Sequence, residues 1–130
     1  MNREITCGRG EALSRTDVAE RYLTVAELAA EDDAHASRNV AVGNAVLAGI
    51  AASDALCCLR LGRRSRGQDH HAAVDLVRHV DATLARDLDR LLRLKDTAHY
   101  GDQFISSDKV ISSVRAAQRL VEAAREATRT

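Results

Sequence analysis

The chain has 130 residues, of which 45% are hydrophobic and 29% charged, and its 19 basic residues balance its 19 acidic ones. This composition excludes a disordered tail and predicts one domain that buries roughly two-thirds of its unfolded surface. A formal net charge of zero excludes global attraction to nucleic acid or to an anionic membrane, so such binding would need a local patch.

The residue types favour helices over sheets. The sequence contains no proline, and its aromatic residues are limited to Tyr22, Tyr100 and Phe104. Alanine, leucine, arginine and glutamate are good helix formers, whereas strands prefer aromatic and β-branched residues. We therefore predict an all-α fold.

The cysteines and the N-terminus bear on the compartment. Cys7, Cys57 and Cys58 are an odd number with two adjacent, which makes a poor disulfide framework and indicates a reducing compartment. The first residues lack the apolar core of a signal peptide. The predicted localisation is cytoplasmic.

The N-terminal third predicts an arm followed by a helix. Residues 1–15 show no hydrophobic periodicity and include two glycines, so we expect a flexible arm, followed by a single helical domain over residues 16–130. Thr16 or Asp17 is a suitable N-cap for the first helix. Its apolar stripe has three- and four-residue spacing and consists of Val18, Tyr22, Val25 and Ala29.

The segment from Val40 to Leu61 is apolar nearly all round, which is typical of either a membrane span or a buried helix. Asn44, Ser53 and Asp54 interrupt it, so we predict a central bundle helix and no membrane. Asp54 would then be buried and would need a partner: an arginine, a histidine or a backbone amide.

Two further helices complete the prediction. Asp69 is a suitable N-cap for a third helix that ends before Gly101, and Ser106 or Ser107 begins a fourth. Four helices joined by short turns predict an up-down-up-down bundle.

Four arginines lie at the end of the second helix and in the loop after it: Arg60, Arg63, Arg64 and Arg66. They could bind phosphate through charge alone, or form an ordinary solvated loop. In an up-down bundle this segment lies a helix length away from His99, which is near the end of the third predicted helix. His70 and His71 are adjacent and point about 100° apart, which makes a weak metal pair, and no phosphate-binding loop or dinucleotide fingerprint is present, so we expect neither metal nor cofactor.

Three stretches together resemble the HEPN domain, a four-helix family of prokaryotic toxins, antiphage nucleases and nucleotidyltransferase partners. They are the small-residue helix Ala48–Cys57, the segment Asp69–Ala73, and the segment Leu91–Asp102. Nuclease members carry an arginine, four to six residues and a histidine, which Arg93 and His99 match. Other, non-catalytic members read arginine-x-x-alanine-acid-tyrosine, and Lys95–Tyr100 follows that form with His99 at the acid's position.

The resemblance implies a homodimer in which two motifs build one metal-independent RNA-cleaving site. Histidine is suited to proton transfer near neutral pH and a guanidinium to stabilising phosphate oxygens, so the candidate site residues are Arg93, Lys95, Asp96, His99 and Tyr100. In a regular helix Lys95 and His99 share a face, whereas Arg93 and His99 lie about 120° apart. Alternatively, Arg93 simply pairs with Asp89 four residues before it.

Two functions follow from the resemblance. The first is a non-catalytic homodimeric interaction module of a toxin–antitoxin or defence system that docks a partner such as a nucleotidyltransferase. The second is a metal-independent ribonuclease that acts on RNA through His99 with Arg93 or Lys95.

Overall fold

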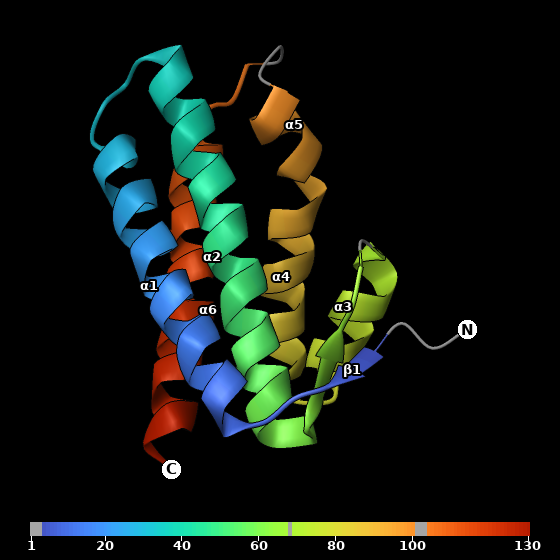
Figure 1. The fold of residues 1–130 in the computed structure, drawn as a ribbon. Helices are drawn as coiled ribbons and strands as arrows, with labels where there is room; N and C mark the ends of the chain where they lie inside the picture. The colour runs from blue at the N-terminus through green and yellow to red at the C-terminus, as the bar shows by residue number, and fades with distance from the viewer. Residues whose placement is uncertain (1–3, 68, 101–103) are drawn as a thin grey trace.

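The computed structural model describes residues 4–67, 69–100 and 104–130, most of which are helical. The elements in chain order are β1 (Glu4–Thr6), α1 (Arg9–Ala30), α2 (His35–Leu61), β2 (Arg63–Ser65), α3 (His70–Arg78), α4 (Ala82–Arg93), α5 (Lys95–Tyr100) and α6 (Ser107–Arg129). The helices α1, α2, α4 and α6 lie side by side, and α5 extends beyond the end of α4 (Figure 1). The all-α prediction is confirmed for most of the chain, although it did not include the two short strands.

The helix α2 occupies the centre because it is apolar on almost every side. It packs against α1, α6, α4, α5 and β2, and most of its buried residues are alanine or glycine, whose small size lets the neighbouring helices approach closely. α2 is also the one helix in the described ranges that is long and apolar enough to cross a membrane, but 72% of its apolar window is buried inside the fold. It begins at His35, five residues before the predicted start at Val40.

The flexible arm predicted over residues 1–15 is wrong for the described part of that segment. Residues 4–6 form β1, which pairs antiparallel with β2, and α1 already begins at Arg9. Thr16 is therefore not a cap but a buried residue within α1, where its hydroxyl donates to the carbonyl of Ala12 at 2.8 Å.

The buried stripe of α1 also differs from the predicted one: Val25 is exposed and Val18, Tyr22 and Ala29 are half-buried. The buried positions, at three- and four-residue spacing, are Ala12, Thr16, Ala19, Leu23 and Ala26. Most of them are alanine, and one is the polar Thr16, so they give a weaker hydrophobic signal than the valines and the tyrosine beside them.

A disulfide fixes the N-terminal segment to the central helix. Cys7, which follows β1, is bonded to Cys58 near the end of α2, and the backbone N–H of Cys7 donates to the carbonyl of Gly62 at 3.0 Å. Gly62 adopts a φ of 74°, a left-handed conformation that ends α2 and turns the chain into β2. The prediction that the cysteines form no disulfide is wrong, since partners 51 positions apart leave no local signal.

The third helix predicted from Asp69 to Gly101 is wrong as a single element. Asp69 does cap α3, where its carboxylate accepts from the N–H of Ala72 at 3.1 Å, but the chain reverses after Arg78. Asp81 then caps α4 by accepting from Leu84 N–H at 2.9 Å. A second break follows at Leu94, before α5, and Gly101 lies outside the described residues.

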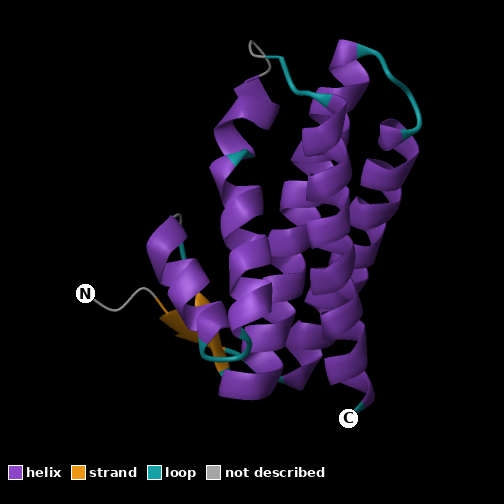
Figure 2. Cartoon of the chain, turned by 180° about the vertical axis from the view of Figure 1, so that it is seen from behind, coloured by secondary structure: helices purple, strands orange, loops and turns teal. Residues whose placement is uncertain are grey.

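The reversal makes α3 a separate short layer at one corner of the molecule. It packs on α4 and β2, and the two strands lie beside it (Figure 2), where β2 also contacts the end of α2. The start of the last helix follows the prediction, since the hydroxyl of Ser106 caps α6 by accepting from Lys109 N–H at 3.2 Å.

Candidate functional site

The break at Leu94 changes the geometry of the predicted catalytic segment. Arg93 closes α4, whereas Lys95, Asp96 and His99 belong to α5, so the angles expected for one regular helix do not apply. Arg93 Nε donates to Asp89 Oδ2 at 2.9 Å, which is the local pairing that the sequence offered as an alternative.

His99 lies exposed on α5, and its ring is oriented by the backbone. Nδ1 is 2.9 Å from the carbonyl oxygen of Lys95. Lys95 and His99 do lie one turn apart on α5, but the imidazole contacts the backbone carbonyl of Lys95 and not its ammonium group. Across the described residues the ring makes no hydrogen bond to the side chain of Arg93 or Lys95. The side chain of Tyr100 lies outside the described part of the structure.

The four arginines between α2 and α3 do not form a uniform loop. Arg60 is exposed at the end of α2 and Arg66 is exposed beyond β2, whereas Arg63 and Arg64 are half-buried on β2 itself. Arg63 Nε pairs with Glu4 Oε1 on β1 at 2.8 Å. Two of the four cations are thus engaged within the fold, and the predicted phosphate patch is reduced to Arg60 and Arg66.

Asp54 is largely buried in α2, and two arginines are its partners. Arg15 Nη2 lies 3.1 Å and Arg64 Nη1 3.9 Å from Asp54 Oδ2. Burial raises the pKa of the Asp54 carboxyl, and the two guanidinium groups oppose that shift by favouring the ionised form. The carboxylate therefore joins α1 and β2 to the centre of α2.

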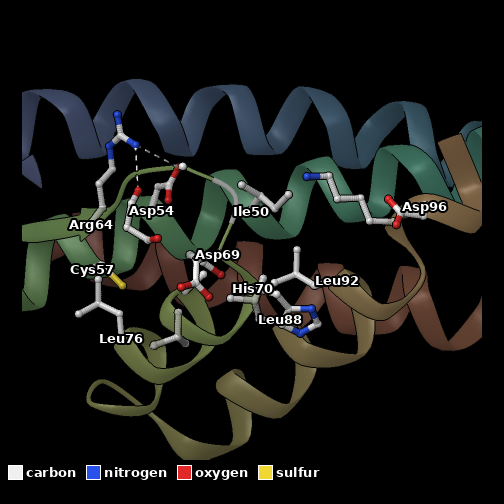
Figure 3. A pocket seen from close by; sticks show the side chains of 16 residues that line it. Ile50, Asp54, Cys57, Arg64, Asp69, His70, Leu76, Leu88, Leu92 and Asp96 are labelled. Carbon is white, nitrogen blue, oxygen red and sulfur yellow. Dashed lines mark hydrogen bonds and ion pairs between the residues drawn. The ribbon is translucent and has the colours of Figure 1, made fainter. Parts of the chain in front are cut away.

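A pocket of about 360 Å³ brings together residues that the sequence placed in separate motifs. Asp54 from α2, Arg64 from β2, and Lys95 and Asp96 from α5 all line it. Figure 3 shows Asp54, Arg64 and Asp96 among the side chains of this pocket, whose other walls include Ile50, Leu76, Leu88 and Leu92. Arg64 and Lys95 share this space because β2 runs back along the molecule from the end of α2, whereas His99 does not line the pocket. The expected separation of the arginine segment from His99 stays a prediction.

The same pocket contains a histidine that the sequence analysis had set aside. His70, at the start of α3, has Nε2 2.8 Å from Asp89 Oδ1 on α4, and Asp89 in turn accepts from Arg93. These hydrogen bonds from Arg93 and His70 lower the pKa of Asp89, so it is ionised and accepts the Nε2 proton of the imidazole. In one continuous helix His70 and Asp89 would lie about 28 Å apart, so only the reversal after Arg78 brings them together.

Cys57 lies at the base of the pocket as a free, buried thiol. Burial, followed by the negative charge of Asp54, raises its pKa to about 12, so the thiol is protonated and a poor nucleophile. Its neighbour Cys58 points elsewhere and forms the disulfide. In the ranges that the structure describes, no group of three or more His, Cys, Asp or Glu side chains could hold a metal ion.

Comparison with known proteins finds no family model and no curated protein that matches this sequence. Function is therefore inferred from the geometry of the chain itself. That geometry offers two features: the pocket between α2, α3 and α4, and a group of exposed apolar side chains at the far end of the molecule.

Proposed function

We propose that the chain is a HEPN-like four-helix up-down-up-down bundle that acts as a homodimeric interaction module of a toxin–antitoxin or defence system. The observation that carries this proposal is a concentration of exposed apolar side chains at the end of the molecule where α1 meets α2. A partner of the nucleotidyltransferase class is the one that the resemblance suggests. The compartment proposed for it is the cytoplasm, on the residues at the N-terminus alone, because the Cys7–Cys58 disulfide removes the argument from the cysteines.

The apolar end, defined as Val25, Leu28, Val40, Phe104 and Ile111, contains five of the six large exposed hydrophobic side chains in the described residues. Val25 and Leu28 lie in the last two turns of α1, Val40 in the second turn of α2, and Ile111 in the second turn of α6. Phe104 is 69% exposed. Apolar residues gathered at one end of a small protein are typical of a protein-binding surface.

Charges around the apolar end suit contact with a second copy of the chain. A groove of about 300 Å³ beside Ile111 contains the acidic Asp32 and Asp33 together with the basic Arg38 and Arg115. Arg38 and Asp33 already pair at 2.7 Å within the chain, whereas Asp32 and Arg115 have no ion pair among the described residues. In a two-fold dimer the same patch meets itself, so Asp32 of one copy can pair with Arg115 of the other. Phe104, stacked on His35 and under the Arg38 guanidinium at 5.3 Å, is the aromatic anchor of this surface.

Light scattering coupled to gel filtration tests the proposal. The native chain is expected to have twice the monomer mass at roughly 10–100 µM, and Phe104→Ser with Ile111→Asp is expected to give a monomer with an unchanged circular dichroism spectrum. Leu13→Asp is the matched control, because Leu13 is as exposed as Ile111 (47% and 48%) but lies at the opposite end of α1. A monomeric native protein, or dissociation by the control alone, would refute the proposal.

The ribonuclease alternative has one observation in its favour. The contact of His99 Nδ1 with the Lys95 carbonyl makes Nδ1 the protonated nitrogen, which leaves Nε2 as the proton acceptor, on the ring edge that faces Gly43 of α2. On this alternative His99→Ala abolishes RNA degradation by the purified chain and Arg93→Ala weakens it. His79→Ala is the matched control, since His79 is also exposed and its Nδ1 lies 2.8 Å from the carbonyl of Asp75. Equal degradation by native protein and His99→Ala would exclude this alternative.

A further inference from the structure

The pocket between α2, α3 and α4 has the construction of a small-molecule site. Its volume of about 360 Å³ lies near the lower end of the range of ligand pockets, about 300–1,000 Å³. One side is apolar, with side chains from α2, α3 and α4: Ile50, Ala73, Leu76, Val77, Leu88 and Leu92. The other side is polar, and a ligand that fills the space needs both an apolar body and a polar group.

Buried polar atoms on the polar side have no partner within the protein. They are the hydroxyl oxygens of Ser53 and Ser65 and the Nε of Arg64, and all three residues line the pocket. Ser53 is only 4% exposed, although it faces a cavity rather than another polar side chain. A buried polar group without a hydrogen bond is unfavourable, and all three of these groups can donate, so they match a ligand rich in acceptors.

The charges of the pocket lead to the same class of ligand. Asp54 is neutralised by Arg15 and Arg64, and one oxygen of Asp69 is occupied by capping α3. The ammonium group of Lys95 and the carboxylate of Asp96, by contrast, have no ion pair with any residue that the structure describes. Lys95 is half-buried and Asp96 is exposed, so the cation lies nearer the apolar wall and water screens the carboxylate more. A cation at the edge of a partly apolar pocket favours an anionic group in the ligand.

We propose that this pocket binds a small organic carboxylate with an apolar body. The carboxylate accepts hydrogen bonds from Ser53 and Ser65 and pairs with Lys95, and the body packs on Ile50, Leu88 and Leu92. An inorganic anion would leave the apolar wall uncovered, and an amine would face Lys95. This site is separate from the apolar end, so it does not depend on self-association.

Nuclear magnetic resonance titration of the full chain tests the site with three molecules of one shape: 3-phenylpropanoate, 3-phenylpropanamide and 3-phenylpropylamine. The carboxylate is expected to bind about tenfold more tightly than the amide. The reason is that a hydrogen bond to a charged group stabilises a complex more than a hydrogen bond between two neutral groups. The shifted signals should belong to residues that line the pocket. No binding of the carboxylate, or equal or tighter binding of the amide or the amine, would overturn the proposal.

Single-residue variants distinguish binding in the pocket from nonspecific binding elsewhere on the surface. Lys95→Gln and Ser53→Ala are each expected to lower the affinity for the carboxylate about tenfold. Ala73→Leu is expected to abolish binding, because the larger side chain fills the pocket, while the circular dichroism spectrum stays helical. The chain has one other lysine, and Lys109→Gln on the exposed start of α6 is the matched control, which should bind as the native protein does. If Lys109→Gln weakens binding as much as Lys95→Gln, the assigned site is wrong.

Discussion

Two glycines of α2 provide a stringent test of the packing at the centre of the fold. Gly43 and Gly49 are both buried in the same helix, but their surroundings differ. A Cβ at Gly49 would lie well inside contact distance of Leu91 Cδ1 and 3.3 Å from Leu120 Cδ1, whereas at Gly43 the nearest atom would be His99 Nε2 at 3.7 Å. Gly49→Ala must therefore displace core side chains, and Gly43→Ala need not.

The expected magnitudes follow from two opposing effects. Replacing glycine by alanine inside a helix stabilises it by about 1 kcal/mol, and Gly43→Ala should show most of that gain. At Gly49 the same gain opposes overpacking of about 1–3 kcal/mol, because Leu91 and Leu120 are fully buried and can move only by repacking the core. We expect Gly49→Ala to lower the free energy of unfolding by about 0–2 kcal/mol, which makes it less stable than Gly43→Ala by about 1–3 kcal/mol.

Guanidinium denaturation followed by far-ultraviolet circular dichroism measures both variants against the native chain. The comparison is made at one protein concentration, since self-association would add to the apparent stability of each. If Gly49→Ala proves as stable as Gly43→Ala or more so, the close approach of α2 to α4 and α6 described above is incorrect.

Three further predictions concern the connections between elements. Reduction, or Cys7→Ser with Cys58→Ser, should lower the free energy of unfolding by roughly 2–5 kcal/mol, because the disulfide closes a long loop; a reductant-independent denaturation midpoint would contradict it. Arg119→Ala should lower the free energy of unfolding by about 1–3 kcal/mol, because Asp87 is 4% exposed and accepts from Arg119 Nε at 2.9 Å and Nη2 at 2.7 Å. A double-mutant cycle with Asp87→Ala that shows no coupling would refute the pairing. Because the pKa of Asp54 is raised in the folded state, the folded chain binds the proton more tightly, so stability falls as the pH rises above the ordinary value of 3.8 through the folded pKa. Asp54→Asn should flatten that fall in denaturation midpoints measured across this window, and an unchanged slope would count against the buried carboxylate.

Local signals in the sequence predicted the elements better than their connections. The N-cap residues Asp69 and Ser106 and the apolar length of α2 are properties of a few neighbouring residues, and the structure has all three. The reversal between α3 and α4 was missed because no glycine or proline interrupts His79–Val80–Asp81, and because Val77, Val80 and Leu84 keep the three- and four-residue spacing of a continuous helix. Asp81 was the one available signal, as an N-cap residue ahead of a new helix.

What the sequence alone determined is the helical character of the chain and the helix that is buried, since composition, periodicity and capping act over one or two turns. The candidate pocket was decided by the tertiary structure. His70 meets Asp89 because the chain reverses after Arg78, and Arg64 shares a space with Lys95 because the chain reverses at Gly62. Cys7 bonds Cys58 because the chain turns back between α1 and α2. Contacts between residues far apart in sequence depend on where such reversals place whole elements, and a pattern that repeats every 3.6 residues contains no record of that placement.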